Sequence, residues 1–232
     1  MDFSIYLAFT GAEWAFMREY GGKAAWMACR FSPGGRGISG VPSSLPPGSM
    51  LMLTDETPVE EHDPQQVAWE MAKAVDALGC ERVLLDFQRE KSEEYCQIVR
   101  AVRETVGCLV GVSELYAQEL DCPVLLSAPP LWTPLSEHLR KWAGREIWLE
   151  AVVEDAVVTV TGQGSRYESC TAHLPENSPV HEGLHVRYWV QTREQEALFL
   201  LRRDKAQLDA LLREAQTLGV RTAVGLYQQL GR

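Results

Sequence analysis

The chain has 232 residues, of which 46% are hydrophobic and 23% are charged, a composition that excludes disordered and collagen-like proteins. Asp and Glu number 32 against 22 Lys and Arg, and the resulting net charge of −10 argues against a nucleic-acid partner. No apolar run approaches the roughly 18 residues that predict a membrane-spanning helix. An acidic second residue without a basic segment argues against a secretion signal.

Six cysteines are scattered along the chain without a Cys-x-x-Cys pair: Cys29, Cys80, Cys96, Cys108, Cys122 and Cys170. This spacing does not predict a zinc knuckle, and a chain of this size does not need disulfides to fold. We therefore expect reduced thiols in a cytoplasmic protein, with neither a metal nor a cofactor. The sequence predicts no particular oligomeric state.

Taken in chain order, short apolar runs alternate with helical stretches. Strands are predicted at 3–9, 24–31, 49–54, 82–87, 108–113, 123–128, 146–152 and 222–227. Helices are predicted at 63–78, 92–106, 114–120, 134–143 and 204–218, and the first of these has Asp63 as its N-cap and Gly79 as its stop. Strand and helix in alternation indicate parallel βαβ units.

Two regions break the alternation. Residues 32–49 are rich in Gly, Pro and Ser and predict a long surface loop. Residues 152–201 hold apolar runs separated by polar turns, which predict an antiparallel insertion.

Eight parallel strands are the number that closes a (β/α)8 TIM-type barrel. We expect one barrel domain over 1–232, slightly trimmed, with only a weak helix after its first strand and none after its last. The antiparallel insertion follows strand seven. A doubly wound open sheet is the alternative, and the absence of a GxGxxG turn after the first strand argues against it.

In a barrel the active site lies at the C-terminal ends of the strands. The residues selected by this rule are Glu13, Trp14, Asp55, Glu56, Asp86, Gln88, Glu114, Tyr116, Trp132, Glu150, Tyr227 and Gln228. Acids, amides and aromatics together suit a sugar, because its hydroxyls need hydrogen bonds and its ring faces pack on aromatic rings. Asp86 follows three apolar residues on a buried strand, where a charge must be partnered or functional.

The strand-four segment ERVLLDFQRE resembles the DxxDxDxE signature of the family-18 glycoside hydrolases, the chitinases and spore-cortex glucosaminidases. The C-terminal layout is also similar to that family, with an insertion, a helix and a last strand that ends in an aromatic residue. The resemblance covers about a third of the chain. It implies a TIM barrel that takes N-acetylated glycans.

Carried over position by position, the signature is degenerate. Its three Asp residues fall on Glu81, Leu84 and Asp86, and its catalytic Glu falls on Gln88. In the family, that Glu protonates the leaving group and the preceding Asp orients the substrate's acetamido group. Gln88 has no titratable proton to donate, but its amide can hold a hydroxyl or an acetamido group. The resemblance therefore implies carbohydrate binding without this hydrolysis.

In this interpretation the substrate-binding residues are Gln88, Trp14, Glu13, Tyr116, Trp132 and Tyr227. An active glycosidase that uses Asp86 with Glu114 or Glu150 is the first alternative, since two carboxyl groups suffice for glycosidic cleavage. A non-catalytic interaction barrel is the second alternative. It predicts no open cleft at the C-terminal ends of the strands.

The string HEGLH, residues 181–185, formally matches the HExxH zinc-protease pattern. That chemistry needs a helix that brings both histidines onto one face. Gly183 within the motif and Pro179 before it argue against such a helix, so we predict a polar turn and no metal.

Overall fold

The computed structural model describes residues 3–57, 61–171 and 173–231, and the chain divides into two compact units. The first unit comprises Met1–Ser127, Gly144–Glu150 and Arg221–Arg232. The second unit comprises Ala128–Ala143 and Ala151–Val220. Among the described residues, no helix is both long enough and apolar enough to cross a membrane.

The first unit is a closed barrel of eight parallel strands, as the sequence predicts. The strands are β1 (Ser4–Phe9), β2 (Ala24–Phe31), β4 (Met50–Thr54), β5 (Arg82–Asp86), β6 (Leu109–Ser113), β7 (Val124–Leu126), β8 (Ile147–Glu150) and β14 (Thr222–Leu226). The barrel closes because β1 pairs in parallel with β2 on one side and with β14 on the other. This pairing excludes the open sheet.

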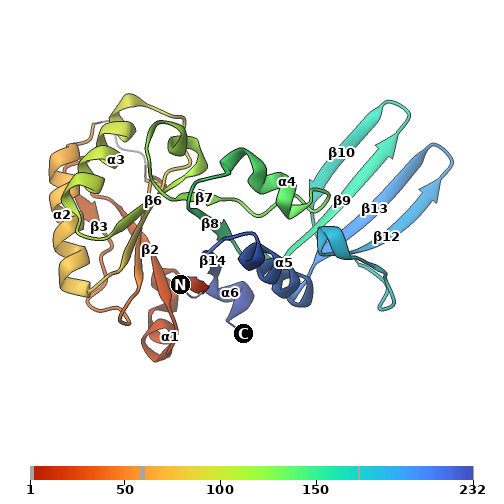
Figure 1. The fold of residues 1–232 in the computed structure, drawn as a ribbon, viewed down its shortest axis with the longest axis horizontal. Helices are drawn as coiled ribbons and strands as arrows, with labels where there is room; N and C mark the ends of the chain where they lie inside the picture. The colour runs from red at the N-terminus through yellow and green to blue at the C-terminus, as the bar shows by residue number, and fades with distance from the viewer. Residues whose placement is uncertain (1–2, 58–60, 172, 232) are drawn as a thin grey trace. The chain divides into compact units, whose positions relative to one another are not determined.

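Helices α2 (Pro64–Leu78) and α3 (Glu93–Thr105) pack against each other outside the barrel (Figure 1). Asp63 caps α2 by accepting a hydrogen bond from Gln66 N at 3.0 Å, and Gly79 ends it with a left-handed φ of 63°. Ser92 caps α3 by accepting from Tyr95 N at 3.2 Å. These caps fix the helix boundaries close to those predicted.

The other helices of the first unit are short. A 3₁₀ turn (Gly11–Glu13) and α1 (Trp14–Glu19) follow β1, a 3₁₀ helix (Glu114–Glu119) follows β6, and α6 (Tyr227–Leu230) follows β14. The expectation of no helix after the last strand is therefore wrong, because the one-turn helix α6 follows β14. A four-residue helix leaves too little hydrophobic periodicity to be detected in a sequence.

The connection from β2 to β4 contains no helix among its described residues, which is where the barrel is trimmed. Within this predicted loop, β3 (Ile38–Ser39) pairs antiparallel with the end of β2. Gly40 has a φ of 76°, and a Cβ there would lie 2.0 Å from the Ala28 carbonyl oxygen, so only glycine fits. Trp26 Nε1 donates to the Gly40 carbonyl at 2.7 Å. The loop is thereby held along β2.

The barrel interior is filled by alternate residues of its strands, as a sheet with a repeat of two requires. The buried cluster consists of Tyr6, Ala8, Ala25, Met50, Met52, Leu84, Leu125, Trp148 and Val224. Trp148 is fully buried, and a Cβ on Gly111 would lie 2.5 Å from its ring. Gly111 therefore makes room for the largest side chain of this core.

The second unit carries a five-stranded antiparallel sheet in the order β10-β9-β13-β12-β11, which confirms the antiparallel insertion after barrel strand seven. Its strands are β9 (Glu154–Thr161), β10 (Gly164–Ser169), β11 (Val180–His181), β12 (Val186–Arg193) and β13 (Glu196–Arg203). Figure 1 shows β9 with β10 and β12 with β13 as two hairpins. Every residue of β10 is exposed, so this strand lacks the apolar signal that predicts the others.

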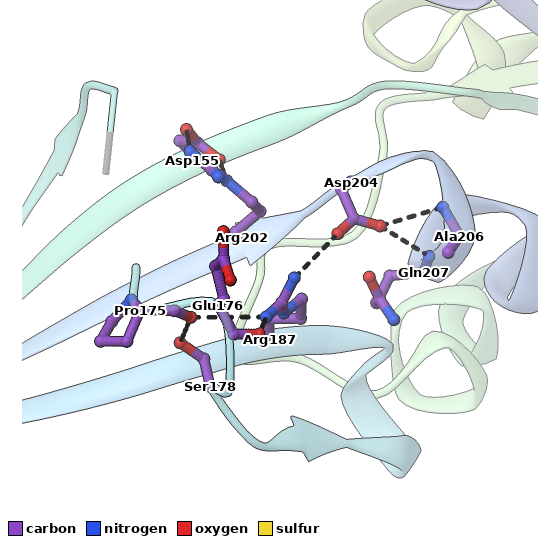
Figure 2. Close-up of polar contacts among 9 residues, drawn as sticks. All are labelled: Asp155, Pro175, Glu176, Ser178, Arg187, Arg202, Asp204, Ala206 and Gln207. Carbon is purple, nitrogen blue, oxygen red and sulfur yellow. Dashed lines mark hydrogen bonds and ion pairs between the residues drawn. The ribbon is translucent and has the colours of Figure 1, made fainter. Parts of the chain in front are cut away.

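The helices of the second unit are α4 (Leu135–Leu139), a 3₁₀ turn (Arg140–Trp142) and α5 (Lys205–Thr217). Asp204 caps α5 by accepting from Ala206 N at 2.9 Å. Arg187 of β12 lies 3.9 Å from the Asp204 carboxylate and donates to the carbonyls of Pro175 and Glu176 (Figure 2). One guanidinium thus ties the loop before β11 to the start of α5.

The HEGLH segment does not form a helix, as predicted. His181 ends β11, a 3₁₀ turn covers Glu182–Leu184, and His185 has a left-handed φ of 51°. His185 Nε2 lies 2.5 Å from the Glu214 carboxylate. Within the described parts of the chain, no group of three His, Cys, Asp or Glu side chains is arranged to hold a metal ion.

Candidate functional site

Four strands of the barrel carry a polar residue two positions beyond their last core residue, on the same face of the strand. Leu84, Gly111, Leu125 and Trp148 lie at the core level of β5, β6, β7 and β8. The residues two positions further along the chain are Asp86, Ser113, Ser127 and Glu150. Because side chains on the same face of a strand recur every two residues, these four side chains point toward the barrel axis at its C-terminal end.

A pocket of about 740 Å³ opens at this end of the barrel. It is lined by Gln88, Lys91, Ser113, Glu114, Leu115, Leu125, Ser127 and Glu150. Its volume is within the range of small-molecule sites, and its lining combines an amide, hydroxyls, carboxylates and an ammonium group. We call this set of residues the mouth pocket.

Asp86 and Gln88 form a pair at the edge of the mouth pocket. The Gln88 side-chain amide donates a hydrogen bond to Asp86 Oδ1. Burial raises the pKa of Asp86; the Gln88 hydrogen bond lowers it, and the nearby Asp55 and Glu56 carboxylates raise it further. A carboxyl group whose pKa is raised by burial is typical of functional sites.

Asp55, the residue after β4, holds the segment that carries Gln88. Its carboxylate is buried and accepts from the backbone N–H groups of Gln88 at 3.1 Å and Arg89 at 2.9 Å. Arg89 Nε donates back to the Asp55 carbonyl at 2.7 Å. Asp55 therefore fixes the start of the loop after β5 and acts as a positioning residue.

Ser113 supports the same segment from β6. Its hydroxyl donates to the Phe87 carbonyl at 2.7 Å and is buried. Glu114 follows it as the first residue of the 3₁₀ helix and lines the mouth pocket. Of the predicted site residues, the structure thus brings Gln88, Glu114 and Glu150 into one pocket, with Asp86 hydrogen-bonded to Gln88.

Tyr116 lies in an aromatic cluster and not on an exposed wall. It is fully buried, and its ring centroid lies 5.8 Å from Phe87 and 6.0 Å from Tyr95. Burial raises the pKa of its hydroxyl to about 12. Tyr116 packs the wall behind the loop that carries Gln88 and is not among the residues that line the mouth pocket.

Glu13 and Trp14 lie after β1. The Glu13 carboxylate is buried and accepts from Thr10 N at 2.9 Å and from the Thr10 hydroxyl at 3.0 Å, which caps the short 3₁₀ turn. Trp14 meets Trp26 edge to face with ring centroids 5.6 Å apart. Both contacts stabilise the turn after β1, and neither residue lines the mouth pocket.

Tyr227 lies directly after β14, between two other rings. Its centroid is 4.6 Å from that of Phe9 and 5.8 Å from that of Phe16, and both pairs are stacked at 25°. Phe16, a residue of α1, has 55% of its surface exposed. Phe16 is not among the residues that the strand-end rule selects, because it belongs to a helix and does not immediately follow a strand.

Trp132 belongs to the second unit. Its ring meets that of Tyr167 edge to face at 4.9 Å, and it lines an apolar pocket of about 450 Å³ on the second unit's sheet. The lining of this apolar pocket is Leu131, Trp132, Val158, Val160, His181, Leu184, Val186, Tyr188, Phe199 and Leu201.

The residues selected from the sequence do not include Lys91, Ser113 and Ser127, which also line the mouth pocket. The repeat of two along each strand could have selected both serines, since each lies two residues beyond a core position. Lys91 has no such signal because it lies in the loop after β5.

No family model matches the chain, and no curated protein matches it. Solved structures do. The spore cortex-lytic enzyme SleL of Bacillus megaterium aligns over 97% of this chain and 70% of its own, with 9% identity and a TM-score of 0.60. A chitinase from Chromobacterium violaceum aligns over 98% of this chain and 95% of its own, with 9% identity and a TM-score of 0.56.

A mutant GH18 chitinase from Cycas revoluta, solved in complex with (GlcNAc)4, is also similar. It aligns over 96% of this chain and 94% of its own, with 9% identity and a TM-score of 0.57. These likenesses show that the chain shares the fold of chitinases and spore cortex-lytic enzymes.

Proposed function

We propose that the mouth pocket binds a carbohydrate that bears N-acetyl groups, and that Gln88 serves as a hydrogen-bonding group and not as a catalytic acid. The observation that carries the proposal is the pocket itself, where Gln88, Glu114 and Glu150 converge at the C-terminal end of a barrel. Carboxylate and amide groups read sugar hydroxyls, and the Gln88 amide also pairs with an acetamido group.

The fold supports this proposal, since the similar Cycas revoluta chitinase is described in complex with (GlcNAc)4. The degenerate signature places Gln88 where the family has its catalytic Glu, which argues against hydrolysis by the family's mechanism. An amide has no proton that titrates near neutral pH, so Gln88 cannot protonate a leaving oxygen. Asp86, hydrogen-bonded to Gln88, would orient that amide toward the sugar.

Isothermal titration calorimetry with a chito-oligosaccharide tests the proposal. We expect brief heat pulses that saturate, and a lower affinity for Asp86→Asn, because the replacement changes the group that orients Gln88. Gln97→Ala, an exposed change on α3, is the matched control and should bind like the wild type. Absence of heat in the wild type, or equal affinity for Asp86→Asn, would contradict the proposed site.

Active glycosidic cleavage is the second candidate, because Glu114 and Glu150 line the same pocket as Gln88, which is hydrogen-bonded to Asp86. Continuous heat after each injection would indicate turnover. Proton NMR of the first product would then separate retention, expected for carboxyl groups about 5–5.5 Å apart, from inversion, expected for about 6.5–9.5 Å. Loss of turnover in Glu114→Gln or in Glu150→Gln would identify the catalytic acid. Unchanged turnover in both variants would exclude these two carboxylates from catalysis.

A pure interaction barrel predicts no cleft at the C-terminal ends of the strands, so the mouth pocket favours the ligand-binding interpretations. We further propose a cytoplasmic location. Its support is that all six cysteines are free thiols, as a reducing compartment would keep them. No nucleic acid, metal or cofactor enters the proposed function.

A further inference from the structure

The antiparallel sheet of the second unit has one long unpaired edge. β10 is the outermost strand of that sheet and, among the described strands, it pairs with β9 alone (Figure 1). Every one of its residues is exposed. Because the N–H and C=O groups of successive residues point alternately to the two sides of a strand, half of those of β10 point away from β9. These groups are free to pair with another strand.

The other free edges in the described part of the chain are protected. β3 and β11 have only two residues each, and Pro179, which has no N–H, comes directly before β11. Short strands and proline are common means of preventing edge-to-edge pairing. β10 has six residues and no proline. The arrangement of its charges therefore decides whether a second strand can pair with it.

The sequence of β10 is complementary to itself in an antiparallel pair. Its segment 165–169 reads Ser-Arg-Tyr-Glu-Ser, with Tyr167 at the centre. When two copies of the strand pair antiparallel about Tyr167, Arg166 of each copy lies opposite Glu168 of the other, and serine lies opposite serine. Opposite charges that face each other across two strands stabilise the pair, whereas like charges destabilise it. In this register no charge of the segment faces a like charge.

The side chains on both faces of β10 fit such a pairing. Arg166 and Glu168 share one face and form an ion pair at 2.8 Å, with 73% and 53% of their side chains exposed. A second copy adds its own pair beside them, so that the four charges alternate in sign. On the other face, the Tyr167 ring contacts Trp132 at 4.9 Å and its hydroxyl donates to the Glu154 carboxylate at 2.6 Å. The Tyr167 ring is thereby held where it would meet its own copy, and aromatic cross-strand pairs are stabilising.

We propose that two copies of the chain associate through β10, so that their two five-stranded sheets become one continuous antiparallel sheet. Tyr167 lies on the two-fold axis, with an Arg166–Glu168 pair on each side of it. Such a contact closes on itself, because both copies use the same edge and no long edge is left over. The inference does not depend on the proposed function, since β10 belongs to the second unit and the mouth pocket belongs to the first.

Sedimentation velocity of the full chain over a wide range of protein concentration tests the dimer. We expect the wild type to become dimeric as its concentration rises. Glu168→Arg makes arginine face arginine on both sides of the axis, and Arg166→Glu makes glutamate face glutamate. Each single variant should therefore raise the dissociation constant of the dimer by at least about tenfold. The double variant Arg166→Glu/Glu168→Arg restores opposite charges and should dimerise as the wild type does.

A mixture and a control sharpen the test. Glu168→Arg mixed with Arg166→Glu should form a heterodimer, because opposite charges then face each other on both sides of the axis. Glu194→Arg is the matched control, since it makes the same charge change at an exposed residue between β12 and β13. This control should dimerise as the wild type does. Circular dichroism melting of each variant checks the fold.

Three outcomes would overturn the proposal. A wild type that stays monomeric at every concentration would show that β10 is an edge kept free of a second copy. A dimer that persists in both single variants would have its interface elsewhere on the molecule. Single variants that are monomeric without rescue in the double variant would mean that Arg166 and Glu168 do not face each other across the two-fold axis.

Discussion

The mouth pocket and the apolar pocket of the second unit differ in the chemistry of their linings. The mouth pocket is lined mainly by polar side chains, with Leu115 and the barrel-core residue Leu125 beside them, whereas the lining of the apolar pocket of the second unit is almost entirely apolar. Leu131, Val186 and Leu201 belong both to that pocket and to the buried cluster of the second unit. This difference predicts that substitutions in the apolar pocket mainly lower stability, whereas substitutions in the mouth pocket mainly lower affinity for the proposed ligand.

The largest expected effect is on stability, at the floor of the apolar pocket. Leu201 is 7% exposed, and Leu201→Ala should lower the free energy of unfolding by about 2–5 kcal/mol because it leaves a cavity. Urea denaturation measures the loss. A loss below about 1 kcal/mol would mean that this pocket is not part of the core, and would weaken the contrast between the two pockets.

The next effect is on binding, at the mouth pocket. Gln88→Ala should reduce chito-oligosaccharide affinity by up to about tenfold, which corresponds to the loss of a hydrogen bond between neutral groups of about 0.5–1.5 kcal/mol. The unfolding midpoint should change little, because the buried Asp55 carboxylate is held by the backbone of residue 88 and not by its side chain. A large fall in the stability of Gln88→Ala with unchanged affinity would mean that Gln88 serves folding and not ligand binding.

The pH dependence of stability isolates Asp86. Burial raises its pKa above the ordinary value of 3.8, so the folded state holds its proton more tightly than the unfolded state does. Asp86 therefore makes its most favourable contribution below pH 3.8, and that contribution is lost as the pH rises through the folded pKa. Asp86→Asn should be more stable relative to the wild type at pH 7 than at pH 3.5, measured as the difference in urea midpoints. If the difference in urea midpoints between Asp86→Asn and the wild type does not change with pH, the pKa of Asp86 is not raised in the folded state.

The smallest effect concerns thiol reactivity. Cys170 of the second unit is exposed, whereas Cys29, Cys80, Cys96 and Cys122 are buried and Cys108 is intermediate. One thiol should therefore react rapidly with a disulfide reagent in the folded protein, and Cys170→Ser should abolish that phase. Rapid reaction of several thiols in the variant would indicate that the barrel is more open than its core suggests.

The barrel and much of its mouth follow from the sequence, because buried parallel strands read as short apolar runs and polar residues at their ends are visible. Asp86, Gln88, Glu114 and Glu150 were selected in this way. Strand ends do not reveal which way a side chain faces, so Tyr116 and Glu13 were selected although the first packs a cluster and the second caps a turn. Phe16 could not be selected, because its stacking on Tyr227 depends on a contact between distant segments.

Hydrogen–deuterium exchange with saturating tetra-N-acetylchitotetraose tests the central claim most directly, since it reports every segment at once. We expect slower exchange in the segments 86–91, 113–115 and 150–151 at the strand ends of the barrel, with no change in β9, β12 or β13. Protection confined to those strands of the second unit, or no protection anywhere, would contradict a glycan site in the mouth pocket.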